Sequence, residues 1–329
     1  MTILVTGGAG YIGSHMVKLL LERNESVVTL DNLTGGHRDA VLGGEFIHGD
    51  LADRELLDRI FREHGITTVM HFASFIQVAE SVRAPGKYYR NNVANTLSLL
   101  DTMVAHEVKQ LVFSSSAAIF GEPGGAPISE QQSICPLTPY GASKAMVERA
   151  LMDYDRAHGV KYIALRYFNA AGADPSSLLG ERHDPETHLI PRVLQAASGR
   201  RDSVTVFGRD YDTPDGTCIR DYIHVSDLCE AHLLAMRKLQ RDGASAEYNL
   251  GNGNGYSVQQ VIETARRVTG TKINVMDGSR RDGDPARLVA DSTRALRELG
   301  WKPQHADLET IIAHAWQYHR TRSMKTESR

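Results

Sequence analysis

The chain has 329 residues, with 37 Lys or Arg and 40 Asp or Glu, which gives a formal net charge of −3 at pH 7. This balance argues against nucleic acid as a partner, because neutralising phosphates requires a surplus of basic side chains. Hydrophobic residues make up 41% of the sequence, which is typical of a globular protein, and no apolar run approaches the roughly 18 residues of a membrane-spanning helix. We therefore expect no membrane partner, and an N-terminus that starts as a strand rather than a leader predicts a cytoplasmic location.

Short apolar runs alternate with helical patterns over residues 1–170. The expected strands are Ile3–Val5, Val27–Leu30, Phe46–Ile47, Val69–Phe72, Leu111–Phe113 and Tyr162–Leu165. Between them, apolar residues recur at helical spacing, as in the segment from Asn92 to His106. Nearly continuous apolar strands that alternate with helices are typical of a parallel sheet covered on both faces. We therefore expect an α/β fold whose first domain, residues 1–170, is a doubly wound, Rossmann-type sheet.

Residues 171–320 follow a looser pattern. A stretch rich in Gly, Pro and Asp, from Ala170 to Glu186, predicts a loop. The elements expected after it are the helices Leu189–Ala197, Val225–Leu239, Val258–Thr269, Thr293–Leu299 and Leu308–Tyr318 and the strands Val204–Phe207, Tyr248–Leu250 and Ile273–Val275. We expect a smaller mixed α/β substrate lobe, with some of the chain crossing back to the first domain, and a frayed polar tail at residues 321–329.

Three glycines, Gly7, Gly10 and Gly13, stand between the first expected strand and an amphipathic helix. In this position glycines allow a tight turn and let a pyrophosphate approach the main chain at the positive end of the helix. Asp31 ends the second expected strand, where a carboxylate accepts hydrogen bonds from a ribose and repels a 2′-phosphate. The pattern therefore predicts a dinucleotide site that holds NAD rather than NADP.

Tyr140 and Lys144 are four residues apart, after a plausible helix start at Thr138 and Pro139. Their side chains would leave the same face of a helix, and a nearby ammonium favours the phenolate form that a general base requires. Ser116 ends a serine run at the carboxyl end of an expected parallel strand, where doubly wound folds bind ligands. We expect Ser116, Tyr140 and Lys144 to be the catalytic residues.

Other kinds of site lack their signatures. Cys135, Cys218 and Cys229 form no C-x-x-C pair, and the sequence has no H-E-x-x-H, G-x-S-x-G or Walker A lysine. His183 and His188 stand close together in a predicted loop, where a surface role is the simpler interpretation. We therefore expect no metal site.

Nearly the whole chain resembles the extended short-chain dehydrogenase/reductase family, and within it the nucleotide-sugar 4-epimerases of galactose metabolism. The motifs that carry the resemblance are Thr6–Gly7–Gly8–Ala9–Gly10–Tyr11–Ile12–Gly13, Leu30–Asp31–Asn32–Leu33, His71–Phe72–Ala73, Ser114–Ser115–Ser116–Ala117, Tyr140-x-x-x-Lys144, Arg166–Tyr167–Phe168–Asn169, Arg220–Asp221–Tyr222–Ile223–His224–Val225, Arg280–Arg281–Asp282–Gly283–Asp284 and Gly300–Trp301–Lys302–Pro303.

The resemblance implies NAD on the first domain, a UDP-sugar between the lobes, and interconversion of UDP-glucose and UDP-galactose by transient oxidation at C4. The implied NAD-binding residues are Gly7, Gly10, Tyr11, Ile12, Gly13, Asp31, Asn32, Asp50, Leu51, Phe72, Ala73, Ser74, Asn91, Ser114, Tyr140, Lys144 and Phe168. The implied substrate-binding residues are Ser116, Asn169, Leu189, Phe207, Arg220, Arg281, Asp284 and Leu288. It also implies a homodimer, with Lys87 to His106 and Tyr140 to His158 as the interface segments.

Several alternatives stay open. Related dehydratases need carboxylates just after the serine run, where this chain has Ala117, Ala118 and Ile119, so dehydration is disfavoured. Leu288 stands where a bulkier Tyr closes the sugar pocket in some relatives, which makes UDP-N-acetylglucosamine or a UDP-uronate an alternative substrate. A non-catalytic NAD-binding regulatory protein is a distant alternative, because such proteins typically lose the Tyr and Lys that this chain keeps.

Overall fold

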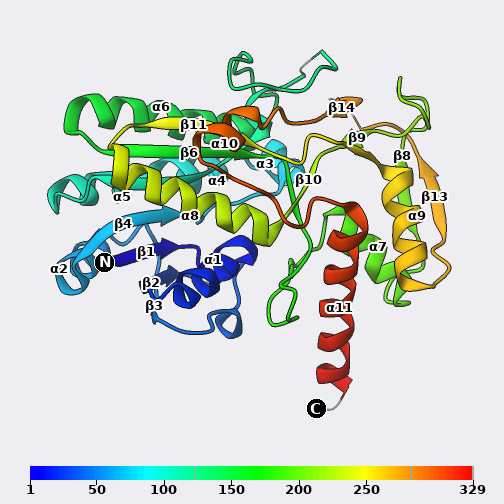
Figure 1. The fold of residues 1–329 in the computed structure, drawn as a ribbon, viewed down its shortest axis with the longest axis horizontal. Helices are drawn as coiled ribbons and strands as arrows, with labels where there is room; N and C mark the ends of the chain where they lie inside the picture. Colours follow the sequence, from blue (N-terminus) through cyan, green and yellow to red (C-terminus); the bar gives the residue numbers. More distant parts are fainter. Residues whose placement is uncertain (123, 282–283, 328–329) are drawn as a thin grey trace.

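A computed structural model of the chain describes residues 1–122, 124–281 and 284–327, with side chains as far as residue 322. Its centre is a seven-stranded parallel sheet in the order β11-β6-β5-β4-β1-β2-β3 (Figure 1). The strands are β1 (Thr2–Thr6), β2 (Ser26–Asp31), β3 (Glu45–His48), β4 (Ile66–His71), β5 (Gln110–Ser116), β6 (Lys161–Tyr167) and β11 (Ala246–Leu250). The topology confirms the predicted doubly wound α/β fold.

Helices cover both faces of this sheet, which explains why its strands are apolar throughout. Ile3 and Val5 of β1 lie in a cluster with α1 (Tyr11–Glu22) and α8 (Val225–Asp242). Leu4 points the other way, because successive strand residues face opposite sides. It packs in a second cluster formed by α2 (Arg54–His64), α5 (Asn95–Ala105) and α6 (Pro139–His158). Five short elements complete this part: η1 (Arg38–Ala40), α3 (Val78–Arg83), α4 (Pro85–Tyr88), η2 (Tyr89–Ala94) and η3 (Ala117–Ile119).

The second lobe is built around a separate apolar cluster, which includes Ile190, Val261 and Ile311. These residues come from the helices α7 (Leu189–Ala197), α9 (Val258–Thr269) and α11 (Leu308–Glu327), which lie together beyond one end of the large sheet (Figure 1). Three small sheets accompany them: β7 (Asn169–Ala171) with β10 (Tyr222–His224); β9 (Ile219–Arg220) with β12 (Tyr256–Ser257) and β14 (Arg287–Leu288); and β8 (Val204–Phe207) with β13 (Val275–Gly278).

The chain crosses back to the first domain after β10. Strand β11 pairs with β6, α10 (Thr293–Glu298) packs beside β11, and α8 covers one face of the sheet. Trp301 follows α10 and is 1% exposed, and its indole N–H donates to the main-chain oxygen of Asp227 at 2.8 Å. The seven-stranded sheet therefore includes a strand, β11, that lies well beyond residue 170 in the sequence.

Three predicted elements differ from the structure. The strand predicted at Ile273–Val275 is found at Val275–Gly278, because β13 pairs only with β8 and its later residues are too polar to form an apolar run. The predicted loop Ala170–Glu186 begins inside β7, which is too short to show a periodic pattern. Residues 321–327, predicted to fray, continue α11 because its earlier turns are anchored in the second core; residues 328 and 329 lie outside the described residues.

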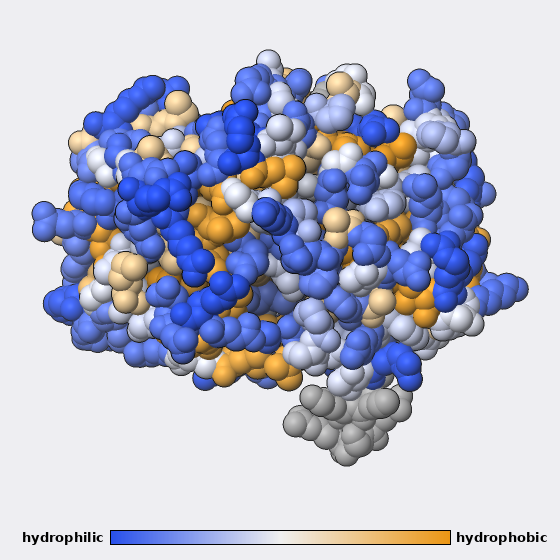
Figure 2. All heavy atoms as spheres, in the orientation of Figure 1, coloured by the Kyte–Doolittle hydropathy of each residue, from blue (hydrophilic) through white to orange (hydrophobic). Residues whose placement is uncertain are grey.

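Among the described residues, no helix is both long and apolar enough to cross a membrane. Figure 2 shows one face of the molecule, on which hydrophilic residues predominate and apolar ones form scattered patches.

Candidate active site

The glycine motif forms a tight turn from β1 into α1. Gly7 has a φ of +72°, and Gly10 occupies the N-cap position of α1. A Cβ at Gly13 would lie 2.2 Å from the main-chain oxygen of Gly7, and one at Gly7 would lie 2.5 Å from the nitrogen of Ala73. Only glycine allows this close approach, which leaves the N–H groups of the first helical turn available to an anion.

Asp31 is held against this turn. Its carboxylate accepts hydrogen bonds from the main-chain nitrogens of Ala9, at 2.9 Å, and Leu33, at 2.8 Å. Burial raises the pKa of Asp31, and these two hydrogen bonds oppose the rise. Beside it, the Asn32 amide donates to the Asp50 carboxylate at 2.6 Å. These groups therefore form one polar edge at the ends of β2 and β3.

The other residues expected at NAD lie along the same edge of the sheet. Tyr11 and Ile12 open α1, Leu51 is buried beyond Asp50, and Phe72, Ala73 and Ser74 follow β4 directly. Asn91 lies in η2, a π-helical turn of a kind that is frequent at functional sites. The glycine turn, which any Cβ would fill, and the fixed carboxylate fit the pyrophosphate and adenosine ribose of NAD.

Ser116 and Tyr140 meet at the carboxyl end of β5. Ser116 is the last residue of β5, and Tyr140 lies in the first turn of α6, whose N-cap Thr138 accepts a hydrogen bond from the Gly141 nitrogen. Burial raises the pKa of the Tyr140 phenol, and a hydrogen bond with Ser116 opposes this rise. The pair can therefore hold one substrate oxygen and exchange a proton with it.

Lys144 lies one turn after Tyr140 and is 3% exposed. Its ammonium donates to the main-chain oxygen of Ser114 at 2.8 Å and lies 5.0 Å from the centre of the Phe113 ring. Burial lowers the pKa of Lys144 to about 7. Burial is the main influence on the Tyr140 pKa in this structure, and the sequence prediction that the Lys144 ammonium favours the phenolate form stays a prediction.

Sequence reasoning missed a buried polar network behind Lys144. Glu148, one helical turn further along α6, accepts hydrogen bonds from the Ser115 hydroxyl at 2.5 Å and from the Arg166 guanidinium at 2.6 to 3.2 Å. Glu148 also raises the pKa of Lys144 against the effect of burial. The sequence contained an indication of this network. Glu148 stands four residues after Lys144, and Arg166 ends an apolar run before Tyr167; charged side chains in such positions need a partner when they are buried.

Four of the residues that the resemblance assigns to UDP binding form two side-chain contacts with each other. Arg220 in β9 forms an ion pair with Asp284, and the Arg281 guanidinium stacks over the Phe207 ring at 4.0 Å. The charges of Arg220, Asp284 and Arg281 all act on the Cys218 thiol, so the two contacts share one region. Two guanidinium groups in one region can bind a diphosphate, since each presents several fixed donors.

The remaining expected substrate residues connect this region to the catalytic pair. The Asn169 side-chain amide donates a hydrogen bond to the main-chain oxygen of Asp221 at 2.8 Å. Leu189 is the first residue of α7. Leu288 pairs with Arg220 in register and, like Phe168, packs against a cluster formed by Ala117, Ile119, Phe120 and Ile128, which begins directly after Ser116. Residues 282 and 283 of the expected Arg281 motif lie outside the described residues.

The chain matches the family described as "NAD dependent epimerase/dehydratase family" over residues 3–251. A UDP-glucose 4-epimerase from Halalkalibacterium halodurans is 53% identical over 320 residues, which cover 97% of this chain and 96% of that protein. The structure of UDP-glucose 4-epimerase from Brucella ovis in complex with NAD aligns with a TM-score of 0.94 at 47% identity, covering 96% of this chain and 98% of that one.

A third relative has both ligands. The UDP-glucose 4-epimerase from Bifidobacterium longum in complex with NAD+ and UDP aligns with a TM-score of 0.93 at 38% identity and covers 98% of this chain and 99% of that one. These matches confirm the resemblance that the motifs indicated. Because the family match covers about three quarters of the sequence and the relatives align from end to end, the chain belongs to the NAD dependent epimerase/dehydratase family.

Proposed function

We propose that the protein is a UDP-glucose 4-epimerase, which interconverts UDP-glucose and UDP-galactose by transient oxidation at C4 with tightly bound NAD. The observation that carries the proposal is the meeting of Ser116 and Tyr140 at the carboxyl end of β5, in the same parallel sheet as the glycine turn after β1, in a chain 53% identical to a protein of that name. Net redox change is zero in this reaction, so the protein needs no second substrate.

Tyr140 takes the proton of the sugar O4 hydroxyl in one half of the reaction and returns it in the other. Ser116 hydrogen-bonds the phenol in this structure, and with the sugar bound its single O–H would donate to the same sugar oxygen instead. NAD, when bound, supplies the acceptor and donor of the C4 hydride. Because burial raises the pKa of Tyr140, a positive charge beside the phenol is needed to favour its phenolate form.

The UDP moiety is expected to be the fixed part of the substrate. Arg220 and Arg281 would hold its diphosphate, and Asn169, Leu189 and Phe207 would line the rest of the site. Arg220 forms an ion pair with Asp284 in this region. With UDP held and the sugar free to rotate, both faces of C4 can reach the same catalytic residues.

The test is to purify the protein without added cofactor, incubate it with UDP-galactose and follow the sugar anomeric protons by NMR. Formation of UDP-glucose, together with release of NAD from the denatured protein, is the expected result. Bound NAD without conversion would indicate a UDP-uronate or another UDP-sugar. Neither NAD nor conversion would favour the non-catalytic NAD-binding alternative.

UDP-N-acetylglucosamine is a second candidate substrate. Leu288 packs with Phe168 near the residues that follow Ser116, and it is smaller than the Tyr that would narrow the sugar pocket there. A structural relative from Campylobacter jejuni, 40% identical with a TM-score of 0.85, is described as a UDP-Glc/GlcNAc 4-epimerase. We therefore propose some activity on the N-acetylated sugar in addition to the main reaction.

We also propose a homodimer. The neighbouring helices α3 and α6 expose large apolar side chains, with Val82 60% exposed and Met146 49% exposed. Exposed apolar groups of this size favour burial against a second surface. A mass of two chains in light scattering, reduced by Met146→Glu, would support this; a monomer at micromolar concentration would contradict it. The cytoplasmic location stays a prediction.

A further inference from the structure

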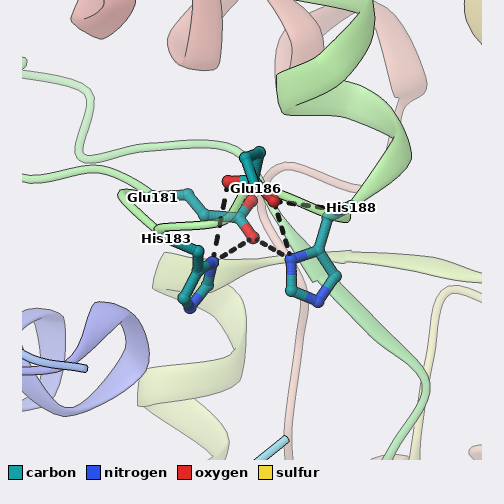
Figure 3. A group of neighbouring side chains, drawn as sticks. All are labelled: Glu181, His183, Glu186 and His188. Atoms are coloured by element: carbon teal, nitrogen blue, oxygen red, sulfur yellow. Dashed lines mark hydrogen bonds and ion pairs between the residues drawn. The ribbon is translucent and has the colours of Figure 1, made fainter. Parts of the chain in front are cut away.

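A second group of chemically active side chains lies outside the proposed catalytic pair. It consists of Glu181, His183, Glu186 and His188, in the segment between β7 and α7, and is called the His–Glu cluster below. Figure 3 shows the two imidazole rings on one side, with both carboxylates facing them. In the sequence only the two histidines stand out, because the loop pattern gives no indication that the two glutamates turn toward them.

Each ring presents its Nδ1 atom to both carboxylates. The His188 Nδ1 lies 2.8 Å from a Glu181 oxygen and 3.1 Å from a Glu186 oxygen. The His183 Nδ1 lies 3.1 Å from the same Glu181 oxygen and 3.7 Å from the other Glu186 oxygen. One ligand atom from each of the four residues falls within 4.8 Å of all the others.

The nitrogen–oxygen separations are close to those of a tetrahedral metal site, although the limit for the whole set of ligand atoms is wider, at 4.8 Å. Zinc–nitrogen and zinc–oxygen bonds are about 2.0–2.2 Å, so neighbouring ligand atoms of a tetrahedron are roughly 3.3–3.5 Å apart. The four nitrogen–oxygen distances, from 2.8 to 3.7 Å, bracket this value. Two imidazoles with two carboxylates also form a donor set suited to zinc-class ions, whereas magnesium prefers oxygen atoms alone.

We propose that the His–Glu cluster binds one zinc-class divalent cation, with both Nδ1 atoms, one Glu181 oxygen and the Glu186 carboxylate as its ligands. Ordinary ion pairing explains the cluster less well. The His183 Nδ1 is shielded from solvent and lies close to the Glu181 carboxylate, yet it makes no hydrogen bond of acceptable geometry. A metal between the two groups requires no alignment of an N–H with an oxygen, so the observed arrangement suits a cation at the centre.

Burial and charge support the same inference. The side chains of Glu181 and Glu186 are 7% and 6% exposed, and two carboxylates so close together need compensating positive charge. The neighbouring Arg182 guanidinium pairs with Asp39 at 2.7 Å, so this charge comes from His183 and His188 when they are protonated, or from a cation that takes the place of their protons. A cavity of about 150 Å³ is lined by three cluster residues, Glu181, His183 and Glu186, and offers an ion a route of entry.

The position of the cluster indicates what a bound ion would do. The His183 ring makes an edge contact with Tyr11 in the first turn of α1, with ring centres 6.4 Å apart. His188 is the N-cap residue of α7, immediately before Leu189. An ion here would therefore join the start of the second lobe to the glycine turn of the first and stabilise the segment that ends at the proposed UDP site.

The test uses the full-length, untagged protein after treatment with EDTA and dialysis, titrated with zinc in a calorimeter. We expect one zinc per chain. Glu181→Gln removes a ligand with little change of shape, and we expect it to weaken binding by at least the roughly 10- to 100-fold that the loss of an outer-shell partner causes. If that variant does not fold by circular dichroism, His183→Asn takes its place.

The matched control comes from another histidine group. His224 and His314 lie with ring nitrogens 3.0 Å apart, near His305, so His314→Gln tests whether zinc binds there instead. Unchanged zinc affinity in His314→Gln, together with an anomalous zinc peak at the His–Glu cluster in crystals, would support the proposal. Absence of stoichiometric binding, or affinity unaffected by Glu181→Gln, would overturn it. No substrate is present, so these results do not depend on the proposed reaction.

Discussion

The Lys144 ammonium donates a hydrogen bond to the main-chain oxygen of Ser114, 2.8 Å away, and so ties α6 to the end of β5. Ser116 ends that strand and Tyr140 lies one turn before Lys144, so this bond fixes the two elements that carry the proposed catalytic pair. Glu148, one turn further along α6, stabilises the charge of Lys144. Buried polar contacts therefore link the two elements that carry Ser116 and Tyr140.

Replacing Tyr140 by Phe should remove the proton acceptor while keeping the ring. We expect turnover to fall by about 10²–10⁴-fold, the usual contribution of general acid–base catalysis. Tyr154→Phe, on the same helix but hydrogen-bonded to Asp101 at the surface, is the control and should keep its turnover. The measurement is the turnover number for UDP-galactose, with bound NAD quantified in each variant. Near wild-type turnover in Tyr140→Phe would refute the assignment of the base.

Gly13→Ala should disrupt the cofactor site. The added Cβ would lie 2.2 Å from the main-chain oxygen of Gly7, which neither backbone segment can accommodate without moving. We expect NAD bound per chain to fall sharply in the purified protein. Gly124→Ala is the control, because a Cβ there meets no atom within 4 Å. Equal NAD content in the two variants would show that this turn does not bind the cofactor.

His71 should make the protein less stable in acid. The Thr96 hydroxyl donates to the Asn92 oxygen and so accepts from the His71 Nε2–H, which leaves Nδ1 to accept from the Thr6 hydroxyl. This neutral form is buried, and burial lowers its pKa to about 3. Below pH 6.5 the unfolded chain binds a proton at this residue that the folded chain does not, so stability is lost as the pH falls toward 3.

The measurement is urea unfolding of wild type and His71→Gln from pH 7.5 downward. The stability advantage of the wild type should shrink below pH 6.5 by up to about 1.4 kcal/mol per pH unit. If the difference in unfolding free energy between wild type and His71→Gln stays constant across this pH range, His71 does not titrate in this way.

Leu288→Tyr should change the choice of sugar. A larger ring beside Phe168 would narrow the space next to the residues that follow Ser116. We expect activity on UDP-N-acetylgalactosamine to fall by at least about 10-fold, the effect of one poorly fitting group, while activity on UDP-galactose is kept. Leu296→Tyr, at a position 46% exposed on α10, is the control. If wild type has no activity on the N-acetylated sugar, the inference from Leu288 is wrong.

The fold was predictable because most of its parallel strands are apolar runs, and helical segments follow several of them, such as α1 after β1 and α2 after β3. Helices α7 and α9 have the bounds that the sequence predicted, since both have apolar periodicity and α9 also has a capping box at Ser257 and a left-handed Gly270 at its end. Strand β13 was misplaced, because an edge strand in a two-stranded sheet lacks such a pattern.

The candidate site was predictable where chemistry follows local spacing, as with Tyr140 and Lys144. It was less predictable where it depends on contacts between distant segments. The hydrogen bond between Arg166 and Glu148 and the ion pair between His188 and Glu181 both depend on tertiary packing. The pKa of Lys144 could not be predicted either, because it depends on burial that the sequence does not specify.

The most direct measurement follows the hydrogen at C4 of the sugar. UDP-galactose carrying deuterium at C4 is incubated with the purified protein in ordinary water, with no NAD added, and the UDP-glucose formed is analysed by NMR and mass spectrometry. Oxidation and reduction at C4 within one enzyme molecule predict that the deuterium is retained at C4 of UDP-glucose. Replacement of the deuterium by hydrogen from solvent would contradict the proposed reaction.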